Sequence, residues 1–163
     1  MADSGKKKAA GLPLPLMQGL HGEFYRHCAA GRLSFQRCSD CGRWRHVPRE
    51  ICPACSSWNW SWEQSSGRGT VYTYTIAERP MHPSFAERCP YAVAVVEMEE
   101  GVRVLSQVVD CPPSELEIGA AVTVDYLSVG PERTGANDRQ GEEAGDAGAS
   151  DSEGIVLPVF RLA

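Results

Sequence analysis

The sequence predicts a mainly β protein: an N-terminal helix, then a small cysteine-bearing ribbon, then a five-stranded OB-type barrel. Three observations support this fold class. Two CxxC pairs separated by ten residues mark the ribbon, five strand-like runs follow them, and an amphipathic stretch precedes them. A small antiparallel sandwich is the structural alternative for the five runs.

The amphipathic stretch predicts a helix within residues 16–32. Apolar residues recur every four positions along one side of it, at Leu16, Leu20, Phe24 and Cys28. Gly31 supplies a helix stop. We expect this side to pack on the protein's own core, and docking on a partner is the alternative. Residues 1–15 are expected to be disordered, because they are small, basic and then interrupted by prolines.

The five strand-like runs are rich in β-branched and aromatic residues. They cover residues 69–76, 91–98, 102–109, 121–127 and 155–162. A short Glu99-Glu100-Gly101 link predicts a hairpin between the second and third runs. Ser114 and Glu117 predict a capping box on one helical turn between the third and fourth. This order matches an OB barrel, with Pro158 at an edge or bulge of the last strand.

The expected domains are the helix (16–32), the ribbon (33–63) and the barrel (64–163). Residues 130–154 carry seven acids and two bases, so their net charge of −5 equals that of the whole chain. Their composition predicts a flexible acidic insertion before the last strand. A plain solvated loop is the simpler interpretation, and an electrostatic docking arm is the other.

Four of the seven cysteines form the two CxxC pairs, and the odd total fits a secreted disulfide scaffold poorly. A CxxC turn lets two thiolates converge on one ion. Gly42 after the first pair permits a tight turn, and Pro53 within the second restricts its backbone. The sequence therefore predicts one structural zinc ion with four ligands: Cys38, Cys41, Cys52 and Cys55.

A zinc ion closed by four thiolates has no position for water, so we expect it to fold the ribbon and not to catalyse. A redox pair is disfavoured, because two CxxC pairs occur without a βαβ pattern. No third residue accompanies His82 and Cys89 to complete a catalytic set. The chain also lacks a glycine-rich phosphate loop, a GxSxG elbow and an HExxH motif.

Several motifs occur in an order typical of one family. They include Gln36-Arg37-Cys38-Ser39-Asp40-Cys41-Gly42, Cys52-Pro53-Ala54-Cys55, Ser66-Gly67-Arg68-Gly69-Thr70-Val71 and Leu157-Pro158-Val159-Phe160. The chain resembles the zinc-ribbon/OB-fold family of acyl-CoA-associated proteins, long classed as a domain of unknown function. The resemblance covers residues 20–130 and 155–162.

The resemblance implies a rubredoxin-like zinc ribbon and a chain that is no enzyme on its own. It implies an accessory subunit of a thiolase-like partner, either a thiolase or a lipid-transfer-type aldolase, acting on fatty acyl-CoA or steroid side chains. A heterotetramer is expected by symmetry, with acyl-CoA contact at the shared interface. Candidate interface aromatics are Phe24, Tyr25, Trp44, Trp58 and Trp60.

Two other functions are weighed against this one. A single-stranded nucleic-acid-binding module needs a basic face, but the excess of bases is confined to residues 1–63, which carry nine bases and five acids. The acidic remainder of the chain disfavours phosphate backbones. An independent enzyme could hold acyl-CoA on the barrel near Arg79, Arg88 or Arg103.

The sequence also bears on location. No apolar run approaches the roughly 20 residues that span a bilayer. The Leu12–Met17 stretch is too short and too rich in proline for the core of a signal peptide. We expect a cytoplasmic protein without a membrane partner.

Overall fold

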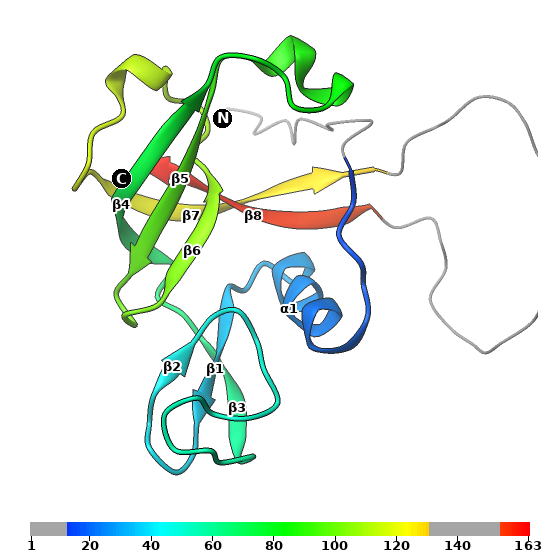
Figure 1. Ribbon diagram of the computed structural model, residues 1–163, viewed down its shortest axis with the longest axis vertical. Helices are drawn as coiled ribbons and strands as arrows, with labels where there is room; N and C mark the ends of the chain where they lie inside the picture. Colours follow the sequence, from blue (N-terminus) through cyan, green and yellow to red (C-terminus); the bar gives the residue numbers. More distant parts are fainter. Residues whose placement is uncertain (1–12, 131–153) are drawn as a thin grey trace, which may run out of the picture.

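The computed structural model describes residues 13–130 and 154–163. It contains a β-barrel, a three-stranded ribbon below it and one α-helix beside their junction (Figure 1). The expected disorder of residues 1–15 and flexibility of residues 130–154 fall mainly outside the described ranges, so both stay predictions. Within the described ranges, no helix is long and apolar enough to cross a membrane.

Helix α1 spans Gly19–Ala29 and ends in a Schellman motif. Gly31 has a φ of 71°, and the Arg32 N–H donates to the His27 carbonyl at 3.0 Å. Gly31 is therefore the predicted helix stop. Phe24 and Cys28 are buried, whereas Leu16 precedes the helix and is 79% exposed. The helix packs on strands of both the ribbon and the barrel.

The ribbon is an antiparallel sheet in the order β2-β1-β3. Its strands are β1 (Ser34–Cys38), β2 (Trp44–Arg45) and β3 (Trp60–Gln64). Strand β1 is central: Arg37 pairs with Trp44 on one side and with Ser61 on the other. Each end of the ribbon's long loop is thereby held against β1, which brings the two CxxC turns to one end of the sheet.

The barrel confirms the five predicted strands, in the order β6-β5-β4-β7-β8. The strands are β4 (Arg68–Ala77), β5 (Tyr91–Met98), β6 (Arg103–Gln107), β7 (Ala121–Val129) and β8 (Ile155–Leu162). The barrel closes where Val108, just after β6, forms a parallel bridge with Phe160. The neighbouring Val109 N–H donates to the Phe160 carbonyl at 2.8 Å. This closure is typical of an OB fold and excludes the sandwich alternative.

Two short 3₁₀ helices interrupt the barrel: η1 (Pro83–Arg88) between β4 and β5, and η2 (Pro113–Glu115) between β6 and β7. The helical turn predicted at η2 is confirmed, but its capping box is wrong. Pro112 stands at the N-cap, and no side chain caps the turn. Pro158 lies in β8 at the end of the strand order, as predicted for a residue without an N–H.

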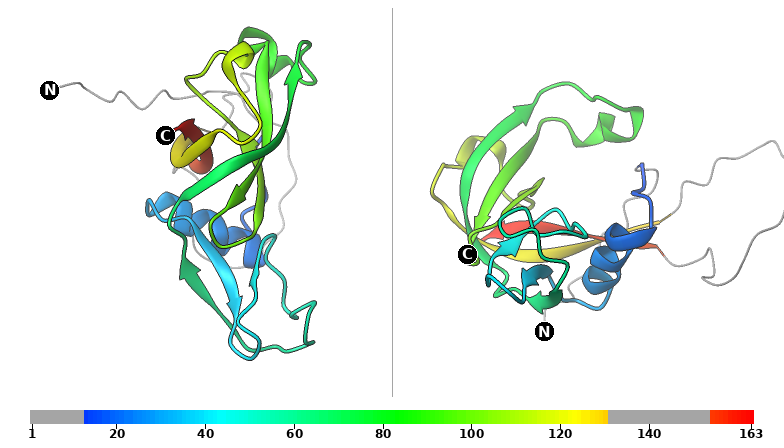
Figure 2. Two further views of the ribbon diagram at one scale, coloured as in Figure 1. Left: turned by 90° about the vertical axis from the view of Figure 1, so that its left-hand side faces the viewer. Right: turned by 60° about the horizontal axis from the view of Figure 1, so that its bottom comes forward.

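One hydrophobic core joins the helix, the ribbon and the barrel. It includes Phe24 of the helix, Phe35 of the ribbon and Phe160 of the barrel, with Trp44 and Trp62 packed against its margin. Figure 2 shows from two further sides that α1 lies at the junction of ribbon and barrel. The position of the ribbon on the barrel is therefore fixed by side-chain packing as well as by the chain connection.

Candidate metal centre and the surface around it

The four predicted ligands converge on one point at the end of the ribbon. The sulfur atoms of Cys38 and Cys55 are 3.6 Å apart, and those of Cys41 and Cys52 are 3.7 Å apart. All four sulfurs lie within 4.8 Å of one another. A tetrahedral zinc with four bonds of about 2.3 Å places its sulfurs about 3.8 Å apart. The donor set and spacing therefore fit one structural zinc ion.

Both cysteine turns have the same backbone design. The Gly42 N–H donates to the Cys38 carbonyl at 2.9 Å, and the Ser56 N–H donates to the Cys52 carbonyl at the same distance. Gly42 has a φ of 71° and Ser56 a φ of 58°. The left-handed conformation costs a residue other than glycine about 1 kcal/mol. Ser56 was not singled out from the sequence, because only glycine signals this conformation.

Backbone N–H groups stabilise the thiolate form of two of the four cysteines. The Cys41 N–H lowers the pKa of the Cys38 thiol. The Ala54 and Cys55 N–H groups lower the pKa of the Cys52 thiol to about 6. Zinc binds thiolates, so donors that stabilise the deprotonated sulfur also stabilise the metal complex.

A buried polar cluster supports the ribbon beside the cysteine turns. Gln36 is fully buried and Arg45 is 6% exposed. The Gln36 Oε1 accepts from the Arg45 Nε and from the Arg49 N–H, each at 2.8 Å. The Arg45 guanidinium also donates to the Arg49 carbonyl and lies 5.6 Å from the Trp60 ring centre. The cluster fixes the loop that leads to Cys52, and sequence patterns gave no signal for it.

The five candidate interface aromatics occupy different environments. Phe24 is 5% exposed and belongs to the core, so it is not available to a partner and we withdraw it. Trp44 packs against the core under the Arg37 guanidinium. Trp60 donates from Nε1 to the Glu50 carbonyl at 3.0 Å. Tyr25 is partly buried. Trp58, by contrast, is exposed to solvent over 66% of its surface.

Trp58 has an apolar neighbour that the sequence analysis missed. The Cys52 N–H donates to the Ser57 carbonyl at 2.8 Å, which sets Ile51 and Trp58 on adjacent chain segments. Ile51 is 40% exposed. Trp58 precedes β3, so it lies outside the strand that carries Trp60 and Trp62. The pair Ile51 and Trp58 is called the ribbon tip below.

The other cysteines and histidines form no catalytic arrangement among the described residues. Burial raises the pKa of the Cys28 thiol to about 12, which makes it inert. Burial also raises the pKa of the Cys111 thiol. The His82 Nδ1 is hydrogen-bonded to the Ser84 hydroxyl at 2.8 Å and caps η1.

Comparison with known families gives two adjoining matches. Residues 26–60 match the rubredoxin-like zinc ribbon domain of ChsH2, and residues 62–127 match the C-terminal OB-fold domain of ChsH2. The chain is also 39% identical, over 105 residues, to a DUF35 domain-containing scaffold protein of Methanocaldococcus jannaschii, covering 64% of this chain and 71% of that one. The chain belongs to the ChsH2/DUF35 family.

Two further relatives of this ChsH2/DUF35 chain have informative names. A probable enoyl-CoA hydratase alpha subunit of Thermomonospora curvata is 37% identical over 129 residues, covering 79% of this chain but only 40% of that subunit. A solved structure described as an Ltp2-ChsH2(DUF35) aldolase matches with a TM-score of 0.69 and 32% identity. That match covers 91% of this chain and 98% of the other.

Proposed function

We propose that this chain is a non-catalytic accessory subunit that binds a thiolase-like acyl-CoA enzyme, either a thiolase or a lipid-transfer-type aldolase. The observation that carries the proposal is the likeness over nearly its full length to the DUF35 chain of an aldolase complex. The similarity to the DUF35 domain-containing scaffold protein supports the same role. The similarity to the probable enoyl-CoA hydratase alpha subunit supports a role in acyl-CoA metabolism, although this chain spans less than half of that subunit's length.

The chemistry of the chain supports a role without catalysis. Four thiolates around zinc leave no open coordination position. The Cys28 thiol is buried and its pKa is raised to about 12, so it cannot act as a nucleophile near neutral pH. The metal therefore serves to hold the ribbon in one shape.

The ribbon tip is the proposed contact surface. Trp58 and Ile51 are large, apolar and open, and they stand on turns fixed by the metal ligands on either side. Tryptophan is enriched among residues that dominate binding energy. Tyr25, Trp44 and Trp60 are proposed to support this surface, each with part of its own area already packed.

The charges weigh against the nucleic-acid alternative. Arg37 pairs with Glu63, Arg68 with Glu99, and Arg103 with Glu97. Arg45 is buried. These pairings reduce the positive charge that the described surface offers to phosphates.

The proposal is tested by producing the chain together with candidate thiolase-like proteins of the same organism, and by measuring mass and stoichiometry with light scattering. A stable complex is expected, and a heterotetramer is the proposed form. Trp58→Ala should weaken the complex about tenfold or more. Met81→Ala is the matched control, because Met81 is 90% exposed but lies in the β4–β5 connection.

Two results contradict the proposal. One is a chain that stays monomeric with every thiolase-like protein offered at micromolar concentration. The other is turnover of an acyl thioester by the purified chain alone, which would make it an enzyme in its own right.

A further inference from the structure

The metal centre has a buried side and an exposed side. Cys38 and Cys52 are 2% and 1% exposed, whereas Cys41 and Cys55 are exposed residues. Each CxxC turn therefore contributes one ligand of each kind: its first cysteine is enclosed by the ribbon, and its second lies at the surface. The exposed side of the centre is thus formed by two thiolates that come from different turns.

The difference in burial follows from the backbone pairing of the ribbon. Cys38 ends β1, where it pairs with Trp60 of β3. The Cys52 N–H donates to the Ser57 carbonyl at 2.8 Å. The second cysteine of each turn instead lies outside the sheet, in the turn itself. Exposed turns open more easily than paired strands, so the two exposed ligands can move while the two buried ones stay in place.

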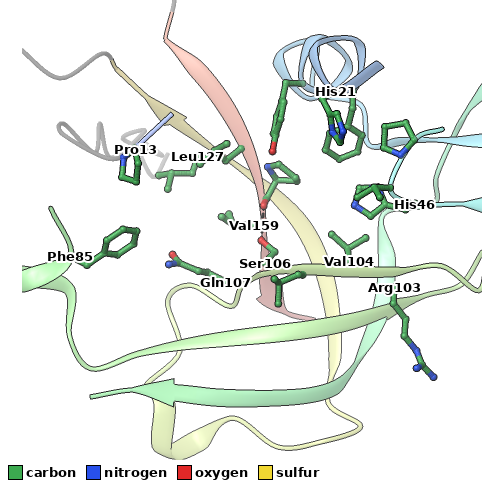
Figure 3. A pocket seen from close by; sticks show the side chains of 17 residues that line it. Pro13, His21, His46, Phe85, Arg103, Val104, Ser106, Gln107, Leu127 and Val159 are labelled. Atoms are coloured by element: carbon green, nitrogen blue, oxygen red, sulfur yellow. Dashed lines mark hydrogen bonds between the residues drawn. The ribbon is translucent and has the colours of Figure 1, made fainter. Parts of the chain in front are cut away.

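A hollow of about 550 Å³ opens beside Cys41. Gly42, Arg43 and Trp44 line it from the ribbon, and Glu100 lines it from the β5–β6 turn. Among the described residues in its lining, Cys41 is the one metal ligand. The cavity beside β6 and β8 that Figure 3 shows has no sulfur atom among its lining side chains. A small solute in the hollow of the ribbon therefore meets Cys41 before the other ligands.

The charges in this hollow favour reaction of a thiolate with a peroxide. The Arg43 side chain is exposed and contributes a positive charge. The Glu100 carboxylate is engaged elsewhere, because it accepts from the Ser65 hydroxyl at 2.9 Å and from the Ser66 N–H at 2.7 Å. Reactive cysteines lie in electropositive, partly exposed surroundings. A nearby cation also stabilises the hydroxide that leaves when the peroxide bond breaks.

The thiols outside the metal centre lack this combination of properties. Burial raises the pKa of the Cys28 thiol to about 12, and it raises the pKa of the Cys111 thiol as well. A protonated thiol is a poor nucleophile, whereas a zinc ligand is held as a thiolate. Cys89 is half-buried and precedes β5, so it provides an internal comparison for the exposed ligands.

We propose that Cys41 and Cys55 form a peroxide-oxidisable pair, and that their oxidation to a disulfide releases the zinc ion. The pair joins the two turns, so it differs from a redox pair within one CxxC turn. All four ligand sulfurs lie within 4.8 Å of one another, so only the turns have to move for the bond to form. This chemistry requires no partner protein.

The oxidation is balanced by hydrogen peroxide and two protons from solvent. The Cys41 thiolate attacks one peroxide oxygen, the O–O bond breaks, and hydroxide leaves and is protonated to water. Cys41 is then a sulfenic acid. The Cys55 thiolate attacks its sulfur, the S–O bond breaks, and a second hydroxide leaves as water. Two electrons pass from the two sulfurs to the peroxide, and the ribbon keeps only two of its four metal ligands.

The first test maps the disulfide in the full chain with zinc bound. Hydrogen peroxide is added in equimolar steps, released zinc is measured with a colorimetric chelator, and free thiols are then alkylated. Trypsin cuts after Arg43 and Arg49, so the two turns fall on different peptides. We expect one zinc ion released per disulfide, a mass-spectrometric link between the two peptides, and alkyl groups on Cys38 and Cys52.

Two outcomes of this mapping overturn the proposal. In one, zinc is released but each disulfide lies inside a single peptide, which means that the reacting pair is not the exposed one. In the other, zinc is retained while Cys89 is oxidised, which means that the exposed ligands react less readily than an ordinary half-buried thiol.

The second test uses variants at the exposed side. Cys41→His keeps a zinc ligand, since structural sites with three cysteines and one histidine are common, but it removes the oxidisable thiolate. This variant should release zinc about tenfold more slowly under peroxide. Release at the wild-type rate contradicts the proposed pair. Circular dichroism and metal analysis check that the variant folds with zinc, and the mapping of the wild type decides if it does not.

Arg43→Gln tests the positive charge beside Cys41. It should slow peroxide-driven zinc release about threefold and leave release to the chelator alone unchanged. A purely structural role of Arg43 would change both rates. Arg32→Gln is the matched control, because Arg32 is an exposed arginine just after α1, and it should change neither rate. Equal peroxide-driven release from the wild type and from Arg43→Gln contradicts attack through the hollow.

Discussion

The carboxylate of Asp40 accepts a hydrogen bond of 2.5 Å from the hydroxyl of Ser57. Asp40 lies inside the first CxxC turn, and Ser57 follows the second. The amide of Asn59 donates to the same carboxylate at 3.3 Å. One acidic side chain thus ties the two halves of the metal site together independently of the metal.

Asp40→Ala should speed zinc loss without removing a ligand. A hydrogen bond to a charged group contributes about 1.5–3 kcal/mol when buried. We expect the lower end here, because the group is exposed, which corresponds to roughly tenfold faster release. The measurement is zinc transfer to a colorimetric chelator. Glu97→Ala, which breaks an exposed ion pair on the barrel, is the control and should release zinc at the wild-type rate.

Cys41→Ser should abolish zinc binding and unfold the ribbon, because three thiolates no longer close the tetrahedron. Partner binding should fall with it, since the ribbon tip depends on the second cysteine turn. Metal analysis and circular dichroism read out the two effects. A folded wild-type protein containing well under one zinc per chain would disprove the metal assignment.

Gln36→Leu should destabilise the protein by about 2–3 kcal/mol. The change leaves the buried Arg45 guanidinium with fewer acceptors, and unsatisfied buried charge is costly. The double change Gln36→Leu with Arg45→Met should recover part of the loss, because it removes the orphaned charge as well. Urea unfolding of the single and double variants measures both values. If the double variant is less stable than Gln36→Leu, the cluster contributes more than charge satisfaction.

Protonation of His46 at acid pH should lower the free energy of unfolding. Its pKa is about 4 in the folded protein against 6.5 for the free side chain, so the unfolded chain binds more protons between these values. The contribution of His46 to the free energy of unfolding is complete above pH 6.5 and is lost as the pH falls toward 4. Linkage gives about 2 kcal/mol lost between pH 7 and pH 5. His46→Gln should flatten this part of the pH profile, measured as the difference between the two unfolding curves.

The ribbon and the strands could be predicted because their signals are local. CxxC pairs, strand-forming runs and the turn at Gly101 each report on neighbouring residues. The capping box failed because Pro112 already occupies the N-cap, so Ser114 is inside the turn. Strand β4 could be predicted, but the need for glycine at position 69 could not. A Cβ at Gly69 would lie 2.6 Å from the Glu97 carbonyl on the neighbouring strand.

The rest of the candidate site depends on contacts between distant residues. Nothing in the sequence links Gln36 to Arg45, or Ile51 to Trp58, because each pair meets only once the ribbon has folded. The burial of Phe24 likewise depends on where α1 docks. The hydrogen bond from the Ser106 hydroxyl to the Pro158 carbonyl likewise joins two strands that lie far apart in the sequence.

The shared core gives the metal an influence beyond the ribbon. Since Phe24, Phe35 and Phe160 belong to one cluster, the ribbon cannot melt without exposing apolar surface on the helix and the barrel. A newly made chain that has not yet received zinc would therefore display that surface to chaperones and proteases. Cellular zinc supply would then govern the abundance of the folded chain.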